Sequence, residues 1–375
     1  MRWILPALAG VGYLAGQVTG QDQEWKSQYF YDEARSSLAI LDLQFASAQR
    51  GVAVGFIAAG THRQPAAVVT SDGGAHWELT KPAELPVSLF FLNEGLGWMV
   101  TESGLWKTTE AGRNWVKLSS FPRGRIIRVY FLDANNGWAV GFKKTVLETH
   151  DGGLKWAAVA AAAAEPGEPA YSAYTWVAFA TPKAGLIQGY NLPPRRTTEF
   201  PSQVDPQAAA NVRDVPHLSY SLETRDGGKN WRPSSESLFG DTTRVRFLPD
   251  GSGIGLIEYS QYFRFASEVF AVDWRTGKSQ SIYKDSKFSV TDVCKTAEGR
   301  VYLAGAVALG RMRQLVEGRV QVLTSPDSKK FEAMGVDYRA NANRVILACP
   351  DGQNVWMATD TGMILKLEQA AGSAR

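Results

Sequence analysis

Residues 149–156 read Thr-His-Asp-Gly-Gly-Leu-Lys-Trp, and this stretch decides the fold of the chain. The carboxylate of Asp151 can accept hydrogen bonds from backbone N–H groups that follow it, as acidic residues in turns do. The two glycines after it permit the positive φ angles of a tight reversal. Trp156 then begins a strand and contributes a large apolar ring to a core. The stretch is therefore predicted to be a turn followed by a strand.

The same stretch recurs along the chain. Clear copies occupy residues 70–77, 108–115 and 224–231, and a weaker copy at 324–331 carries Phe331 in place of the tryptophan. We expect each acid to be committed to its own turn and each tryptophan to anchor a core, so neither is predicted to be catalytic. The acid and tryptophan pairs of the four clear copies are Asp72 and Trp77, Glu110 and Trp115, Asp151 and Trp156, and Asp226 and Trp231.

Short runs of β-branched and aromatic residues precede each copy and complete a repeating unit. In the clearest unit, strands are expected over 128–132, 137–141 and 145–149, with a fourth strand after the turn. Seven such units follow one another. Four-stranded units of about 40 residues, repeated in this way, predict an all-β, seven-bladed β-propeller. The last unit has three strands of its own, so we expect residues 25–30 to supply its fourth.

Both ends of the chain and two insertions depart from the repeat. Residues 1–20 have a basic start, an apolar run and a small-residue exit, which is typical of a cleaved secretory signal, with an uncleaved anchor as the alternative. The signal predicts export to a periplasm, to a compartment like the thylakoid lumen, or out of the cell. We expect the propeller over 21–368 and a disordered tail over 369–375. The insertions lie at about 157–173 and at 191–216, and the second is either an inert excursion or a lid or partner-binding arm.

The chain has two cysteines, Cys294 and Cys349. They fall at similar places in two successive units. Equivalent sites on neighbouring blades are usually farther apart than the Cα separation of about 7 Å that a disulfide allows. We therefore expect two buried free thiols, with a disulfide as the alternative that export permits.

Basic residues are expected to gather on one face of the propeller. Successive strands run in opposite directions, so the loops between units and those between second and third strands share a face, and the repeated turns lie on the other. The net charge is only +3, so a basic face predicts an acidic or carboxylate-bearing partner rather than nucleic acid, with scattered solvated side chains as the alternative. The predicted partner-binding residues are Arg63, Arg123, Arg125, Arg128, Lys143, Lys144, Arg195, Arg196, Arg311 and Arg313.

The repeated stretch has the residue types and spacing of the Asp-box, or BNR, repeat. With the secretory start and a unit that reads Phe-Leu-Asp, Gly-Trp-Ala-Val-Gly and Thr-His-Asp-Gly-Gly-Leu-Lys-Trp, the chain resembles the photosystem II stability and assembly factor family. The resemblance covers essentially all of the chain after the signal. It implies a non-enzymatic, exported propeller that holds membrane-protein precursors or assembly intermediates on a face that contains arginines. We expect a monomer, with peripheral association at a membrane as a further expectation.

The Asp-box also occurs in sialidases and other glycoside hydrolases, which offers a second function class. A sialidase-like signature, Arg-Ile-Pro near the N-terminus, is absent, and no two acids are convincingly paired as glycoside hydrolysis requires. The four histidines show no metal-ligand spacing. We therefore predict no enzymatic activity, no cofactor and no metal. The alternative is a sialidase-like or other carbohydrate-active enzyme, or a carbohydrate-binding module.

Overall fold

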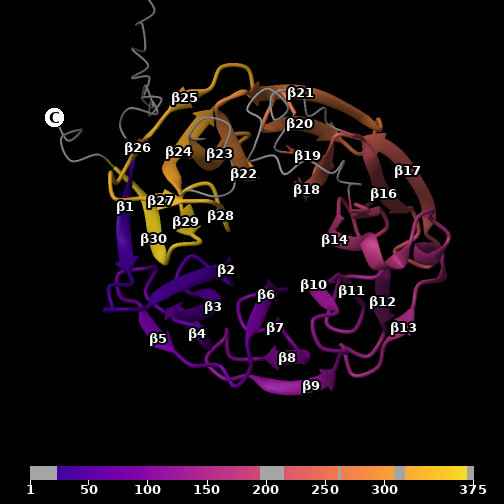
Figure 1. Cartoon of the computed structure of the whole chain (residues 1–375), viewed down its shortest axis with the longest axis horizontal. Coiled ribbons are helices and arrows are strands. Elements are labelled where there is room, and N and C mark those ends of the chain that lie inside the picture. The colour runs from indigo at the N-terminus through magenta and orange to yellow at the C-terminus, as the bar shows by residue number, and fades with distance from the viewer. Residues whose placement is uncertain (1–22, 195–214, 261–262, 308–316, 370–375) are drawn as a thin grey trace, which may run out of the picture.

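The computed structural model of the chain describes residues 23–194, 215–260, 263–307 and 317–369. These residues form seven sheets, and Figure 1 shows them arranged in a ring with one edge of each sheet toward a common axis. The seven-bladed β-propeller predicted from the repeats is confirmed. The predicted signal at 1–20 lies outside the described residues, as does the tail from residue 370 onward.

In each blade the strands follow one another outward from the axis (Figure 1). Their bounds are β2 (Ser37–Phe45), β3 (Gly51–Ala59), β4 (His62–Thr70) and β5 (Glu78–Thr80) in blade 1; β6 (Pro86–Phe91), β7 (Gly97–Thr101), β8 (Gly104–Thr108) and β9 (Val116–Ser120) in blade 2; β10 (Ile126–Phe131), β11 (Gly137–Gly141), β12 (Thr145–Thr149) and β13 (Ala157–Ala158) in blade 3; β14 (Ser172–Phe179), β15 (Gly185–Asn191), β16 (His217–Thr224) and β17 (Arg232–Leu238) in blade 4. They continue as β18 (Gly240–Phe247), β19 (Ser252–Tyr259), β20 (Ser267–Asp273) and β21 (Lys278–Asp285) in blade 5; β22 (Phe288–Lys295), β23 (Val301–Val307), β24 (Gly318–Ser325) and β25 (Glu332–Ala333) in blade 6; and β28 (Val345–Ala348), β29 (Trp356–Thr359) and β30 (Met363–Gln369) in blade 7.

The N-terminal strand β1 (Gln23–Phe30) closes blade 7. It pairs antiparallel with β30, placing Trp25 opposite Leu367. Two short strands, β26 (Gly335–Val336) and β27 (Asn341–Ala342), pair with β1 and β24. Trp25 is buried, and its ring meets the edge of Tyr302 at a centroid separation of 6.4 Å. The prediction that residues 25–30 supply the missing fourth strand is confirmed.

The repeated turns lie between neighbouring blades. In blade 3, Asp151 Oδ1 accepts the N–H groups of Leu154 and Lys155 at 3.0 and 2.9 Å. The φ of Gly153 is +99°, and a Cβ at this position would lie 2.6 Å from a side-chain carbon of Leu105 in blade 2. Glycine is therefore needed both for the backbone angle and for the close approach to the preceding blade.

The tryptophans of these turns are only half-buried, as Trp156 illustrates. The fully buried tryptophans of the ring lie elsewhere, on second strands (Trp98, Trp138 and Trp356) and on the closing strand β1 (Trp25). Trp98 of β7 stacks on Phe131 of the next blade with a centroid separation of 3.6 Å, and Trp356 of β29 stacks on Phe45 of blade 1 at 3.7 Å. Because the second stack joins the last blade to the first, the same aromatic packing continues across the closure of the ring.

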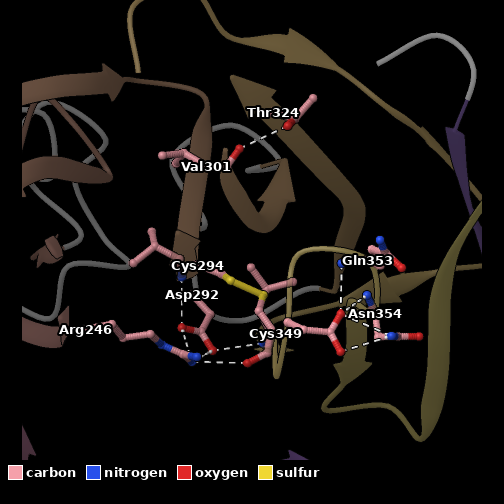
Figure 2. Close-up of a disulfide and its surroundings, with 11 residues drawn as sticks. Arg246, Asp292, Cys294, Val301, Thr324, Cys349, Gln353 and Asn354 are labelled. Carbon is pink, nitrogen blue, oxygen red and sulfur yellow. Dashed lines mark hydrogen bonds and ion pairs between the residues drawn. A yellow bond between two sulfur atoms is a disulfide. The ribbon is translucent and has the colours of Figure 1, made fainter. Parts of the chain in front are cut away.

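Cys294 and Cys349 form a disulfide, so the prediction of two free thiols is wrong. Their Cα atoms are 6.5 Å apart, and Figure 2 shows the bond between β22 of blade 6 and the residue after β28 of blade 7. The prediction failed because innermost strands converge near the axis. Equivalent positions there approach much more closely than they do on the outer strands.

The first insertion lies at blade 4 and contacts the described start of the second, where the N–H of Leu192 donates to the backbone oxygen of Tyr171. The first contains the 3₁₀ helices η2 (Ala160–Ala163) and η3 (Pro169–Tyr171). The second lies between β15 and β16, the second and third strands of the blade, and its residues 195–214 are outside the described part of the chain. None of the described helices is long and apolar enough to cross a membrane.

Candidate partner-binding face

The face that carries the loops between blades, and the turns between second and third strands, is called here the upper face. The repeated turns with Asp72, Glu110, Asp151 and Asp226 join third to fourth strands and lie on the opposite, lower face. Three of these acids accept a backbone N–H of their own turn, whereas Glu110 accepts only the side-chain amide of Asn114. The lower face is thus built from acids that are occupied in local turns.

Several of the predicted basic residues are engaged within the propeller. Arg123 is exposed and forms an ion pair with Glu102. The ammonium of Lys144 donates to the backbone oxygens of Glu165 and Gly167, which fastens the first insertion to blade 3. Arg63 lies on β4 in blade 1, with its guanidinium carbon 4.7 Å from the centre of the Phe56 ring. These side chains are therefore not equally available to a partner.

Arg125 and Lys143 lie on the upper turns of blade 3 and have no carboxylate partner among the described residues. The Arg125 Nε donates to the hydroxyl of Thr145, and its backbone oxygen accepts the N–H of Phe142. Lys143 is exposed at the tip of the β11–β12 turn, where its φ is +59°, a conformation uncommon for non-glycine residues. Blade 3 thus presents two positive charges without counter-charges close together at the upper face.

The remaining predicted residues fall elsewhere. Arg195, Arg196, Arg311 and Arg313 lie outside the described residues. Arg128 is not on the loop face, because it belongs to the innermost strand β10. The structure therefore brings together Arg123, Arg125, Lys143 and Lys144, and separates Arg63 and Arg128 from them.

An exposed apolar patch, which sequence reasoning missed, adjoins the two unpaired charges. We call it the rim patch, and it runs along the upper edge of blade 4 from the neighbouring turn of blade 3. Its members Phe142, Tyr171 and Leu192 are each between 39 and 51% exposed. The N–H of Leu192 donates to the backbone oxygen of Tyr171, and Phe142 forms an isolated bridge with Ala173. Contiguous exposed apolar surface of this kind is typical of binding sites.

Charged residues of the innermost strands meet across the centre of the ring. Arg128 of blade 3 lies 3.6 Å from Asp42 of blade 1, and these blades are not neighbours. Arg244 and Arg246 of blade 5 both pair with Asp292 of blade 6, at 3.3 and 3.0 Å. Figure 2 shows the Arg246–Asp292 pair beside the disulfide. We call these five residues, together with Trp176 of β14, the axial cluster.

Asp292 is completely buried and fully hydrogen-bonded. Its oxygens accept the N–H groups of Val293 and Leu347 at 2.8 and 2.9 Å, besides the two guanidinium groups. Burial raises the pKa of this carboxyl, but Arg246, Arg244 and the backbone donors more than offset that effect, so the pKa lies below its usual range. Asp292 is therefore ionised at neutral pH and unsuited to act as the general acid of glycoside hydrolysis.

The described residues do not form a metal site, and the two histidines of the repeated turns make only local contacts. No group of three or more His, Cys, Asp or Glu side chains in the described ranges is placed to hold a metal ion. His76 contacts Asp72 of its own turn, and His150 contacts Asn136, both at exposed positions. These contacts fit solvated side chains of the lower face.

Comparison with solved structures finds other propellers. The chain is 15% identical to YCF48 bound to a D1 peptide, with a TM-score of 0.59 over 94% of this chain and 99% of that one. It is also 15% identical to YCF48 from Cyanidioschyzon merolae, with a TM-score of 0.57 over 92 and 98%. The extracellular domain of the putative one component system BT4673 from B. thetaiotaomicron gives 11% identity and a TM-score of 0.57 over 92 and 40%. No family model and no curated protein matches the chain.

These likenesses establish a shared fold. At such identities they do not carry a binding site from one chain to another, because propellers of one architecture serve many functions. What the upper face binds must therefore be argued from its own residues.

Proposed function

We propose that this protein is a non-enzymatic binding propeller whose upper face holds a protein partner. The observation that carries the proposal is the adjacency of the rim patch to the unpaired charges of Arg125 and Lys143. An apolar surface beside unpaired positive charge complements a polypeptide segment in which apolar residues are flanked by acidic ones. Membrane-protein segments with acidic flanks have this character.

Two further observations support the proposal. The family that the sequence resembles binds membrane-protein precursors during photosystem assembly, and one structural neighbour is YCF48 bound to a D1 peptide. The Cys294–Cys349 disulfide suits an oxidising compartment, in keeping with the predicted export of the chain. We therefore propose an exported assembly or stability factor that binds a membrane-protein segment on the upper face.

Fluorescence anisotropy with a labelled peptide tests this function directly. The probe is a synthetic peptide with a Leu- and Phe-containing centre and Glu and Asp flanks, and a second peptide has the same centre with Lys flanks. We expect the acidic peptide to bind more tightly than the basic one, and its affinity to fall as salt is raised from about 50 to 300 mM. Equal binding of both peptides would refute the role of the charges.

Matched variants locate the site. Arg125→Gln combined with Lys143→Gln is expected to weaken the acidic peptide about five- to tenfold, since each exposed charge contributes up to about 1 kcal/mol. The control, Lys155→Gln combined with Lys229→Gln, removes two charges from the lower face and is expected to leave binding unchanged. Equal losses in the two double variants would place the peptide elsewhere.

A third set of measurements distinguishes binding of a protein segment from binding of a lipid surface. Phe142→Ala is expected to weaken the acidic peptide at high salt, where the apolar contact dominates. Vesicles of phosphatidylcholine with about a third phosphatidylglycerol offer an anionic lipid surface to the same patch. Binding of these vesicles that depends on Phe142, without binding of either peptide, would replace the protein-binding proposal by a membrane-binding one.

A further inference from the structure

The axial cluster carries more positive than negative charge. Besides its own residues, Arg344 at the start of blade 7 pairs with Glu258 of blade 5 at 2.7 Å, again between blades that are not neighbours. The group then holds four guanidinium groups, of Arg128, Arg244, Arg246 and Arg344, and three carboxylates, of Asp42, Asp292 and Glu258. Asp360 also lies near Arg344, so the charges of this wider group balance. The surplus is confined to the axial cluster itself, where three guanidinium groups meet two carboxylates.

The two carboxylates at the ends of this cluster differ in how completely they satisfy their arginines. Asp292 forms a direct hydrogen bond to Arg246. The carboxylate oxygens of Asp42 accept hydrogen bonds from the backbone N–H groups of Leu43 and Leu89, at 3.0 and 2.9 Å, and none from a described arginine. Arg128 approaches it no closer than 3.6 Å and forms no hydrogen bond with any described residue. The surplus positive charge therefore lies on the Arg128 side.

Three buried donors on the innermost strands β10 and β18 lack partners in the described part of the chain. The Nε atoms of Arg128 and Arg246 and the hydroxyl of Thr243 are buried, and none has a hydrogen-bond partner among the described residues. Thr243 directly precedes Arg244 on β18. Buried polar groups are normally paired, so the unpaired Nε of Arg128, on the side of the cluster where no described carboxylate accepts a hydrogen bond from it, indicates a missing acceptor.

Trp176 sets the orientation of two of the guanidinium groups. The guanidinium carbons of Arg128 and Arg244 lie 4.5 and 4.9 Å from the centre of its ring. The Nε1 of Trp176 donates to the backbone oxygen of Val245, which fixes the indole. A guanidinium that lies over an aromatic ring can donate from the N–H groups at its edge to a two-oxygen acceptor. Arg244 already uses Nε toward Asp292 and donates from Nη1 to the backbone oxygen of Thr243, so only part of its edge is available.

We propose that the axial cluster binds one carboxylate group, held by the N–H donors of Arg128 and by the terminal N–H groups that Arg244 does not already use. The charge favours a monoanion, because a dianion such as phosphate would leave a net negative charge beside Asp42 and Asp292. The geometry favours a carboxylate over chloride, because two oxygens in one plane match the fork of a guanidinium. Arg128 and Arg246 are 17 and 28% exposed at their side chains, so solvent reaches the cluster.

This inference does not rest on the proposed function, since it concerns the axis rather than the rim patch. A carboxylate can come from two sources, a small free acid or the C-terminus of a polypeptide. Titration of the full chain with ¹³C-labelled acetate and formate, followed by NMR, tests the chemistry at constant ionic strength with chloride as the reference anion. Two tetrapeptides, one with a free and one with an amidated C-terminus, distinguish the sources.

We expect saturable binding of acetate and formate that chloride does not displace at equal concentration. Arg128→Gln is expected to weaken acetate binding at least about tenfold, whereas Lys155→Gln on the lower face leaves it unchanged. Tighter binding of the free-acid tetrapeptide than of acetate, with no binding of the amide, would identify a polypeptide terminus as the source. Binding of acetate without the tetrapeptide would identify a free acid.

A variant that is expected to bind acetate more tightly distinguishes a direct effect on the site from unfolding of the protein. Asp42→Asn removes a competing carboxylate, so it is expected to tighten acetate by several-fold, an outcome that general destabilisation does not produce. Arg128→Lys keeps the charge without the planar fork and is expected to fall between wild type and Arg128→Gln. Absence of saturable acetate and formate binding, equal competition by chloride, or weaker binding in Asp42→Asn would each overturn the proposal.

Discussion

Reducing the Cys294–Cys349 disulfide is expected to destabilise the propeller by an amount that follows from the chain it encloses. The bond closes a loop of 55 residues, which in the chain-entropy account removes about 14 cal/mol/K from the unfolded chain, or about 4 kcal/mol at 25 °C. With an unfolding entropy of roughly 2.1 cal/mol/K per residue over roughly 320 residues, this corresponds to a fall in Tm of about 6 °C. The loop spans the contact between blades 6 and 7, so reduction also loosens the blade that β1 closes.

The assay compares oxidised and reduced wild-type protein by calorimetry, with free thiols counted in each sample. Reduced protein keeps both sulfur atoms, so the comparison avoids the cavity that a Cys294→Ala substitution would leave at a buried site. A Cys294→Ala/Cys349→Ala variant should melt at or below the reduced protein. If the fully reduced protein melts within about 1 °C of the oxidised one, the entropic reasoning fails for this loop.

Three further outcomes test the packing of the blades. Trp138→Ala should lower the free energy of unfolding by about 3–5 kcal/mol in urea, and Trp156→Ala by less, because only the first ring is fully buried; equal losses would contradict the assignment. Gly153→Ala should cost about 2–4 kcal/mol through strain and overlap, whereas Gly124→Ala, also at positive φ but with open space around it, should cost only the strain. A backbone N–H and the histidine of its turn lower the pKa of Asp72 to about 2, so its contribution is complete above pH 4 and is lost as pH falls toward 2; Asp72→Asn should flatten acid unfolding in that range.

The fold could be predicted because the same sequence pattern recurs in successive units. Turn residues at fixed spacing and strand-forming runs between them recur in unit after unit, so an error in one unit does not change the architecture. The closing strand followed from counting, since the last unit lacks a fourth strand and Trp25 stands at the right place near the N-terminus. The repeat did not predict how completely each tryptophan side chain is buried. Trp156 follows a surface turn, whereas Trp138 sits on a second strand between two blades, and only the three-dimensional contact tells them apart.

The candidate site was harder to predict, because its residues are distant in the sequence and become neighbours only when the blades pack side by side. Arg125 and Lys143 were assigned to the correct face by the up-and-down order of strands, but their partners were not readable. Lys143 and Lys144 are adjacent and chemically identical, yet the structure fastens only Lys144 to the first insertion. The rim patch escaped notice because Phe142 and Leu192 look like ordinary strand residues when each is taken alone.

The axial cluster and the disulfide were missed for one shared reason, the convergence of the innermost strands. In six of the blades a β-bulge interrupts the innermost strand, and the residue after it occupies one register position around the axis. That position precedes a buried Val or Leu in every unit, so it can be aligned from sequence. Around the ring, with the residue before β28 for blade 7, it is Asp42, Ser88, Arg128, Trp176, Arg244, Asp292 and Arg344. Five of these seven residues are charged although the position lies near the centre of the ring. This is unusual, because burying a charged side chain is costly unless partners surround it. Alignment of the units by their innermost strands, rather than by their turns, therefore places these charges in one column and predicts that they meet at the axis.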